Sequence, residues 1–259
     1  MSEMGIVQTL LDPVFRPLLL KLGPLWTVVL IAFLFSIIAT LVYKWTTNQT
    51  EIKRLRDEMK SSQKRVKELR NEPDKMLEAN KQVMDQVMSS NGKIMKQTVP
   101  SMIITFLLFI FVSSWCAGNL AFEPLHPGEN FTLQVMMQNG AQGNVSVRVP
   151  EGLKVLGELV KPASSIVNFS LVGIGEGNYF VDVLYNEKPY SKEVFITLNQ
   201  RYAEQIKSFS NELIGSVGID YKKLIILPIG IRDWFGWLGI YIWSSLLFSL
   251  VFRKLFKVY

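Results

Sequence analysis

Three long stretches of this sequence contain no charged residue, and they limit what the chain can fold into. Counted inclusively, they hold 22, 26 and 19 residues. An α-helix needs about 20 apolar residues to cross a hydrocarbon layer about 30 Å thick. We therefore predict an α-helical membrane protein with three transmembrane helices. The charge-free runs are Leu22–Tyr43, Gln97–Phe122 and Trp234–Phe252, and the predicted spans are residues 25–43, 99–117 and 235–252.

The charges between these runs are unequally distributed. Residues 44–98 carry 13 Lys and Arg against 8 Asp and Glu, whereas residues 116–233 carry 10 against 12. Residues 253–259 form a basic tail. Positively charged residues near the ends of spans stay in the cytoplasm. We therefore expect a multi-pass protein of the cell membrane with its N-terminus outside and its C-terminus in the cytoplasm. The same rule explains the net charge of +6, so we expect no sequence-specific nucleic-acid partner.

Residues 44–98 carry apolar residues at helical three- and four-residue spacing, in two series separated by "RNEPD". Pro73 breaks a helix, and Asn71 and Asp74 favour turns. We predict a cytoplasmic antiparallel coiled-coil hairpin. The alternative for its charged faces is a solvated helical spacer. The series are Ile52, Leu55, Met59, Val66 and Leu69, then Met76, Leu77, Val83, Met84, Val87, Met88, Ile94 and Met95.

Two further segments have their own character. Residues 1–24 are apolar but contain three prolines, which predicts an irregular extracytoplasmic segment at the membrane interface. Residues 119–200 contain short runs rich in Val, Phe and Tyr between turn sequences, which predicts an inserted extracytoplasmic domain resembling a β-sandwich. Residues 201–234 are expected to form a short helix, in "RYAEQIKSFSNELIGSVG", and a connector back to the membrane.

Four Asn-x-Ser/Thr sequences occur, and each is a possible N-glycosylation site. Three of them fall within the predicted β domain, at Asn130, Asn144 and Asn168. Their common location outside the cytoplasm makes them mutually supporting candidates. The fourth, at Asn48, lies on the expected cytoplasmic side, and we interpret it as accidental.

The sequence offers little for catalysis. One cysteine and one histidine cannot form a disulfide or a Cys/His zinc site, and no nucleophile or phosphate-binding motif is present. We therefore predict no catalytic residues, no metal and no cofactor, and we do not expect an enzyme.

The predicted spans do contain hydroxyl side chains one helical turn apart. Ser and Thr often serve helix packing, which is the simplest interpretation of each one alone. The functional interpretation is a mildly polar groove that shelters polar parts of a passing client chain. The candidates for this groove are Ser36, Thr40, Ser101, Thr105, Ser244, Ser245 and Ser249.

Methionines follow the second arm of the predicted hairpin toward the membrane. Some must serve the hairpin core, yet thioethers also suit surfaces that accept many sequences. The candidate client contacts are Met84, Met88 and Met95.

The order of a span, a cytoplasmic coiled coil and two further spans resembles the archaeal YidC-like insertase family, which is related to the insertase subunit of the endoplasmic-reticulum membrane protein complex. The similarity is strongest in "IMKQTVPSMIITFLLFIFVSSW" (Ile94–Trp115) and "WFGWLGIYIWSSLLFSLVFRKLFKV" (Trp234–Val258). Two features depart from the family. Bacterial relatives place an arginine in the membrane groove, whereas the predicted spans hold no charge, and the inserted β domain has no counterpart.

Together these features predict a membrane protein insertase or chaperone. It would receive nascent hydrophobic segments on the methionines and pass them into the bilayer through the groove. Its expected partners are nascent membrane proteins and membrane lipid, with the ribosome as a further candidate. A structural membrane adaptor with an exposed β domain is the first alternative. An oligomeric ion channel is the second, and it is weakened by the lack of an acidic ring.

The orientation is tested by labelling intact cells with a membrane-impermeant maleimide, in a Cys116→Ser background. Because the Lys and Arg bias places residues 44–98 inside, a Ser164→Cys variant should react and a Ser62→Cys variant should not. The reverse pattern would overturn the orientation.

Overall fold

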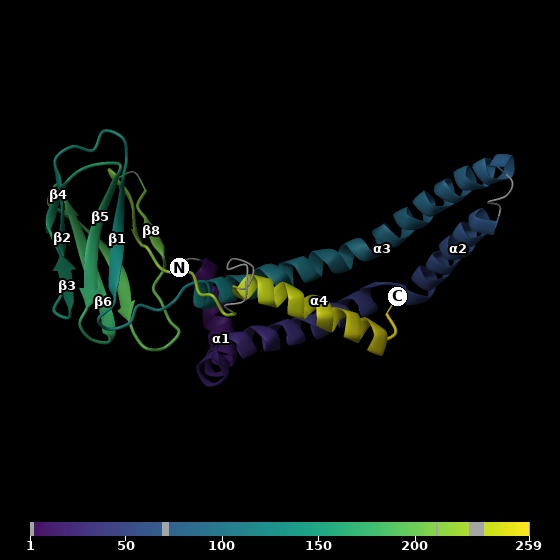
Figure 1. Ribbon diagram of the computed structural model, residues 1–259, viewed down its shortest axis with the longest axis horizontal. Coiled ribbons are helices and arrows are strands. Elements are labelled where there is room, and N and C mark those ends of the chain that lie inside the picture. Colours follow the sequence, from purple (N-terminus) through teal and green to yellow (C-terminus); the bar gives the residue numbers. More distant parts are fainter. Residues whose placement is uncertain (1–2, 69–72, 211, 228–235, 259) are drawn as a thin grey trace. The chain divides into compact units, whose positions relative to one another are not determined.

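Four helices account for the α-helical part of the computed structural model, which describes residues 3–68, 73–210, 212–227 and 236–258 (Figure 1). Three of the described helices are long and apolar enough to cross a membrane, which confirms the prediction of three such helices. The turn expected near Asn71, the start of the third span at Phe235 and residues 228–234 of the connector before it lie outside the described residues. The helices are α1 (Glu3–Thr46), α2 (Gln49–Glu68), α3 (Pro73–Leu120) and α4 (Trp237–Leu255).

The chain forms two compact units, which are described separately below. One unit contains residues 1–27 and 114–238, and the other contains residues 28–113 and 239–259. The first therefore holds the N-terminal part of α1, the end of α3 and all the strands. The second holds the rest of α1 and α3, together with α2 and nearly all of α4.

The N-terminal segment is helical, so the prediction of an irregular segment over residues 1–24 is wrong. The helix contains Pro13, Pro17 and Pro24, and the backbone leaves helical geometry at Gly23, where φ is 76° and ψ is 174°. Glycine adopts a positive φ without the steric cost of a Cβ atom. Helix-breaking residues are tolerated where side chains satisfy the freed backbone groups. Here the Thr27 hydroxyl donates to the Gly23 carbonyl oxygen at 2.8 Å.

The N-terminal part of α1 packs against the end of α3 within the first unit. The indole N–H of Trp115 donates to Asp12 Oδ1 at 2.8 Å, and Phe15 packs against the fully buried Trp115 ring at a centroid distance of 5.2 Å. Arg16 donates to the other oxygen of Asp12 at 3.0 Å. The Gln8 side chain lies over Gly118, so a larger residue at this position would have to displace it. The carboxylate of Asp12 is thus hydrogen-bonded from both helices.

Nine strands in the described residues form two antiparallel sheets, which confirms the predicted β-sheet region (Figure 1). The five-stranded sheet has the order β3-β5-β1-β9-β8, and the four-stranded sheet has the order β4-β2-β6-β7. The strands are β1 (Asn130–Met137), β2 (Asn144–Arg148), β3 (Leu153–Leu156), β4 (Val160–Pro162), β5 (Ile166–Gly173), β6 (Gly177–Tyr185), β7 (Lys188–Ile196), β8 (Ile206–Ser208) and β9 (Ile214–Ile219).

The core of this domain comes from alternate residues of the strands. In β1 and β5, buried residues alternate with more exposed ones along most of each strand. Successive side chains of a strand point to opposite faces of the sheet, so one face of each strand is buried and the other is more exposed. The residues buried below 2% exposure include Leu133, Phe169, Leu171, Val183 and Ile214, all in one apolar cluster. Burial of this cluster is the main source of the domain's stability.

The prediction of a short helix within residues 201–218 is wrong. Residues 206–208 and 214–219 are instead strands β8 and β9, and β9 pairs with both β1 and β8. Val217 and Ile219 are buried in the sandwich core, so tertiary packing decides the structure here. Gly215 and Gly218, near the end of the predicted helix, lie inside β9. The sheet domain therefore extends beyond residue 200, to Ile219.

Side chains from the segment after β7 complete the C-terminal end of α3. The Tyr202 hydroxyl donates to the Ala117 carbonyl oxygen at 2.7 Å and accepts the Ala121 N–H at 2.9 Å. Gln200 Nε2 donates to the carbonyl oxygens of Asn119, at 3.2 Å, and Phe122, at 2.7 Å. The last carbonyls of a helix lack partners within the helix. These contacts supply them and join α3 to the β domain.

The Tyr202 hydroxyl remains a donor over the physiological pH range. Burial raises the pKa of Tyr202 to about 12, although the backbone hydrogen bonds lower it in part. Its ring also packs against Phe122 and Tyr221, at centroid distances of 5.4 and 5.7 Å.

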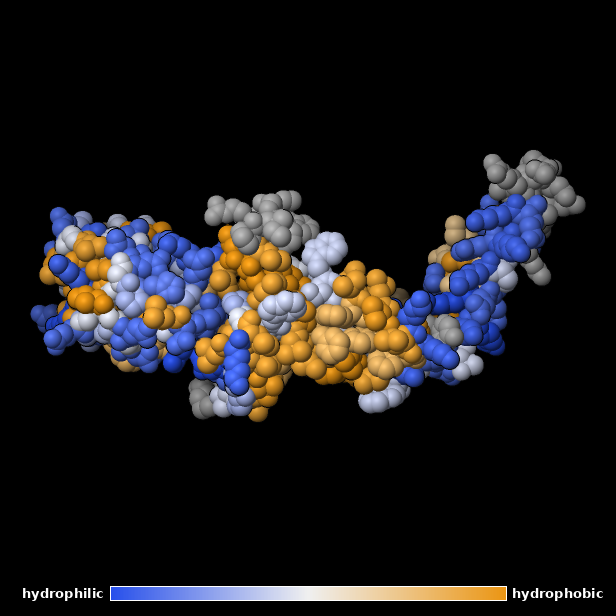
Figure 2. All heavy atoms as spheres, turned by 60° about the horizontal axis from the view of Figure 1, so that its bottom comes forward, coloured by the Kyte–Doolittle hydropathy of each residue, from blue (hydrophilic) through white to orange (hydrophobic). Residues whose placement is uncertain are grey.

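In the second unit, α2 and the first half of α3 lie side by side and antiparallel (Figure 1). Gln97 Nε2 donates to Glu51 Oε2 at 2.8 Å, and the Ser62 hydroxyl donates to Gln86 Oε1 at 2.8 Å. The two contacts are eleven residues apart on both helices and occur in opposite order, as expected for an antiparallel pair. Ile52 and Leu55 are buried at 0% and 2% exposure. Figure 2 shows hydrophilic side chains over this hairpin and hydrophobic ones over the rest of the unit.

Tyr202→Phe should loosen the junction between α3 and the β domain. The variant leaves the Ala117 carbonyl and the Ala121 N–H without their partner, which should cost about 1–3 kcal/mol. We expect a lower thermal unfolding midpoint in detergent and faster amide hydrogen exchange at residues 117–121. Tyr179→Phe removes a single bond to Gly175 at a half-buried site and serves as the control. Equal effects of the two variants would contradict this role of Tyr202.

Candidate functional site: a hydroxyl-lined cavity

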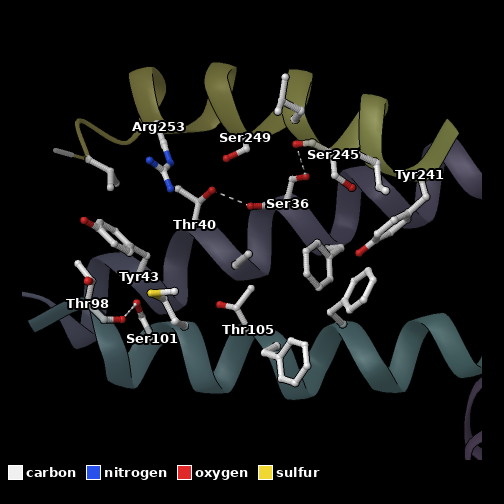
Figure 3. Close-up of a pocket in the computed structure, with 18 of the residues that line it drawn as sticks. Ser36, Thr40, Tyr43, Thr98, Ser101, Thr105, Tyr241, Ser245, Ser249 and Arg253 are labelled. Atoms are coloured by element: carbon white, nitrogen blue, oxygen red, sulfur yellow. Dashed lines mark hydrogen bonds between the residues drawn. The ribbon is translucent and has the colours of Figure 1, made fainter. Parts of the chain in front are cut away.

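Helices α1, α3 and α4 surround a partly open cavity of about 810 Å³ within the second unit (Figure 3). All of its lining residues belong to that unit. We call it the hydroxyl-lined cavity, because Ser and Thr line its middle part on all three helices. These hydroxyl residues are Ser36 and Thr40 from α1, Thr98, Ser101 and Thr105 from α3, and Ser245 and Ser249 from α4.

Helical spacing brings these hydroxyls onto facing sides. Side chains three or four positions apart lie on the same side of a helix. On α4, Tyr241, Ser245, Ser249 and Arg253 are each four residues apart, and all four line the cavity. Every helix therefore presents one continuous side to the cavity.

Most of these hydroxyls donate to carbonyls of their own helix. Ser36 Oγ lies 2.7 Å from its acceptor, the Ala32 oxygen, and 3.1 Å from a second acceptor, the Ser245 oxygen on α4. Thr40 donates to the Ser36 oxygen at 2.7 Å, and Ser101 donates to the Thr98 oxygen at 2.8 Å. A hydroxyl that donates in this way keeps lone pairs free to accept. The cavity wall therefore offers acceptors to an incoming N–H group.

Ser245 differs from its neighbours. Its Oγ is buried and, within the part of the chain that the structure describes, has no hydrogen-bond partner. A buried hydroxyl without a partner is costly, typically by about 1–3 kcal/mol. The Ser245 hydroxyl is thus a donor without an acceptor among the residues that line the cavity.

The two ends of the cavity differ in chemistry. At one end Phe35, Phe109 and Tyr241 form an aromatic cluster with centroid distances of 5.6, 5.8 and 6.5 Å. At the other end the Arg253 guanidinium lies over the Tyr43 ring, 5.4 Å from its centroid, and Arg56 also lines the cavity. The cavity is therefore apolar at one end and positively charged at the other.

Six of the seven residues predicted for a groove line this cavity. Ser244 does not, because it is the neighbour of Ser245 on α4 and projects from a different side of the helix. The residues that line it as predicted are Ser36, Thr40, Ser101, Thr105, Ser245 and Ser249. The structure thus brings hydroxyls from three predicted spans together, while their contact with a client stays a prediction.

The predicted client methionines are exposed on α3. Met84, Met88 and Met95 have exposed fractions of 63%, 69% and 65%, so they are not in the hairpin core. Met102, at 63%, continues the series and lines the cavity. At 3.6 residues per turn the four side chains fall within about 40° of each other around the helix. We call these four residues the methionine stripe.

Sequence reasoning missed the arginines and aromatic residues of the cavity. Arg253 was interpreted only as a charge that sets orientation, and the predicted spans were described as free of charge. The four-residue repeat from Tyr241 to Arg253 was the signal that could have placed Arg253 beside the serines. The remaining predicted sites, Asn130, Asn144 and Asn168, belong to strands of the other unit.

The fold and this cavity define an integral membrane protein of three membrane-spanning-capable helices with a polar-lined space among them. The chain belongs to the integral membrane protein EMC3/TMCO1-like family, whose model matches residues 8–146. This family is part of the YidC/Oxa1/Alb3 superfamily, which confirms the resemblance to the YidC-like insertases. It associates the chain with an insertase-related role.

The matched residues extend from α1 into β2, and α4 lies beyond them. The chain gives no significant match to a curated protein or to a solved structure.

Water access to the cavity is tested with single cysteines in the Cys116→Ser background. A Ser249→Cys thiol should react with a small charged methanethiosulfonate reagent, because Ser249 lines the cavity beside Arg253. A Ser244→Cys thiol, one position from the cavity-lining Ser245, is the matched control and should react much more slowly. Equal rates would contradict a water-accessible cavity.

Proposed function

We propose that the chain is a membrane protein insertase that works without covalent chemistry and has no enzyme activity. Its client is a nascent apolar segment with short polar flanks. The observation that supports this most directly is the exposed methionine stripe, which leads along α3 to a cavity-lining residue, Met102.

In the first step the apolar segment binds the methionine stripe. Unbranched thioether side chains adapt to partners of different shape, which suits a surface that must accept many sequences. The hairpin core supports this role, because Ile52 and Leu55 are buried in the hairpin while the methionines are exposed. We interpret the hairpin as a cytoplasmic antiparallel coiled coil that meets clients or ribosomes.

In the second step the cavity receives the polar flank of the client. Moving a peptide group from water into hydrocarbon without a partner costs roughly 2–7 kcal/mol. Hydroxyl oxygens of Ser36, Thr40 and Ser101 would accept client N–H groups, and the Ser245 hydroxyl would donate to a client carbonyl. These bonds would lower the free-energy barrier to moving the polar flank of the client into the bilayer.

Arg253 and Arg56 add charge selectivity to this step. Guanidinium groups form strong hydrogen bonds with carboxylates. We propose that they attract acidic flanks or a terminal carboxylate to the positively charged end of the cavity. Arg253 would thereby supply the positive charge that bacterial relatives place within the groove.

The proposed orientation places the hairpin and the C-terminus in the cytoplasm and the β domain outside, in the cell membrane. The positively charged end of the cavity would then face the cytoplasm, where clients arrive. The aromatic cluster at the opposite end favours an insertase over a channel, because a channel needs a pore that continues to the outer side.

Met84→Glu/Met88→Glu should abolish most crosslinks between the full chain and a photoreactive nascent apolar segment. Burial of one methionine side chain is worth about 1.5–3 kcal/mol, so the loss of two contacts should reduce crosslinking by about tenfold or more. Met84→Leu/Met88→Leu keeps the apolar surface and should stay within a few-fold of the wild type.

Thermal unfolding of the same variants separates client binding from structure. Because both methionines are exposed, the double Glu variant should melt like the wild type. Leu55→Glu, which buries a charge in the hairpin, should lower the melting temperature. If the double Glu variant melts as early as Leu55→Glu, the methionines support the fold and the client-contact proposal fails.

A further inference from the structure

We infer that the β domain carries N-linked oligosaccharides at Asn130, Asn144 and Asn168. This inference rests on the orientation given under the proposed function, which places the domain outside the cytoplasm. It does not depend on insertase activity.

All three Asn-x-Ser/Thr sequences lie within strands, and in each of them strand geometry gives the side chains the same orientation. Alternate residues of a strand point to the same face. Each asparagine and the hydroxyl residue two positions later therefore share the outward face, while the residue between them enters the core. The asparagines are exposed, and the intervening Phe131, Val145 and Phe169 are only 5%, 0% and 0% exposed.

Alternation of polar and apolar residues could produce such triplets by chance, so their environment matters. The Asn48 side chain is already in use, because its Oδ1 accepts the N–H of Glu51 at 3.1 Å and caps α2. In the described part of the chain, no hydrogen bond ties the side chains of Asn130, Asn144 or Asn168. The structure thus distinguishes three available asparagines from one structural asparagine.

Asn130 and Asn168 stand on the same face of the five-stranded sheet. Asn168 pairs with Gln134 of β1, four residues from Asn130, so the two asparagines lie roughly 14 Å apart by strand geometry. Ile166 and Met136 pair beside Asn168 on this face and are 53% and 40% exposed. A hydrated oligosaccharide at Asn168 would shield this apolar pair from other chains.

The covalent step needs a lipid-linked oligosaccharide as donor and a transferase on the outer side. Asparagine Nδ2 attacks the anomeric carbon, and the new C–N bond forms as the bond between that carbon and the lipid phosphate oxygen breaks. The phosphate leaves with the electron pair, and the amide proton passes to a base of the transferase. Asn168 lies inside β5, so its transfer should precede sheet formation, whereas Asn130 and Asn144 are the first residues of their strands.

The test is glycopeptide mass spectrometry of the full chain purified from its native membranes. We expect a sugar mass on each of the three asparagines and an unmodified Asn48. Thr132→Ala, Ser146→Ala and Ser170→Ala should each abolish the sugar only at the asparagine two residues earlier. Thr132→Ser keeps the hydroxyl, and it should keep the sugar at Asn130.

An unmodified asparagine at any of the three positions overturns the assignment of that site, and three unmodified asparagines overturn the inference. If the sugars are absent while external maleimide still labels Ser164→Cys, the orientation and the proposed insertase stand and only this inference fails. A sugar at Asn48 with none on the β domain would overturn the orientation as well.

Discussion

Hydrocarbon offers no hydrogen-bond partner, so each polar group inside a bilayer must be satisfied by the protein itself. Several hydroxyls around the cavity meet this requirement locally, whereas the Ser245 Oγ does not among the described residues. Ser36, Thr40 and Ser101 each donate to a carbonyl of their own helix. These bonds allow hydroxyls to stand among the apolar side chains of the three helices, and each hydroxyl oxygen keeps lone pairs that can accept a hydrogen bond. The polar character of the cavity is therefore compatible with the stability of the helices that form it.

Backbone groups buried outside hydrocarbon also need partners, and this explains the junction between α3 and the β domain. The end of a helix leaves carbonyl groups without partners. Tyr202 and Gln200 supply these partners from the segment after β7. Trp115 and Asp12 tie the N-terminal part of α1 to the same end of α3. The β domain is therefore built onto the helix end through specific bonds, rather than attached by a free linker.

The elements with strong periodicity could be predicted from the sequence. The three apolar helices follow from the charge-free runs, and the runs containing Phe131, Val145, Phe169, Val181 and Val194 all became strands. The short strands β3, β4, β8 and β9 escaped prediction. Their positions depend on pairing with distant strands, and most of β8 and β9 was predicted as a single short helix.

The cavity was predictable in part for the same reason. Hydroxyls four residues apart on a single helix indicate a shared side, which located six of seven residues, whereas Ser244 was included only because it adjoins Ser245. Arg253 lies on that same side of α4. It was overlooked because a positive charge at the end of a span was already explained by its location in the cytoplasm. The exposure of Met84 and Met88 depends on how the two arms of the hairpin pack, which the sequence does not specify.

Reconstitution into liposomes tests the central claim most directly. The client is a membrane protein with one apolar segment and a short polar tail, and the readout is protection of that tail from external protease. The account predicts efficient protection with the wild type and with Ser244→Leu, which adds a side chain outside the cavity. It predicts protection near the level of protein-free liposomes for Thr105→Leu/Ser249→Leu, which replaces two hydroxyls of the cavity wall by bulkier apolar side chains. Equal protection by the wild type and this double variant, or none above protein-free liposomes with the wild type, would contradict the account.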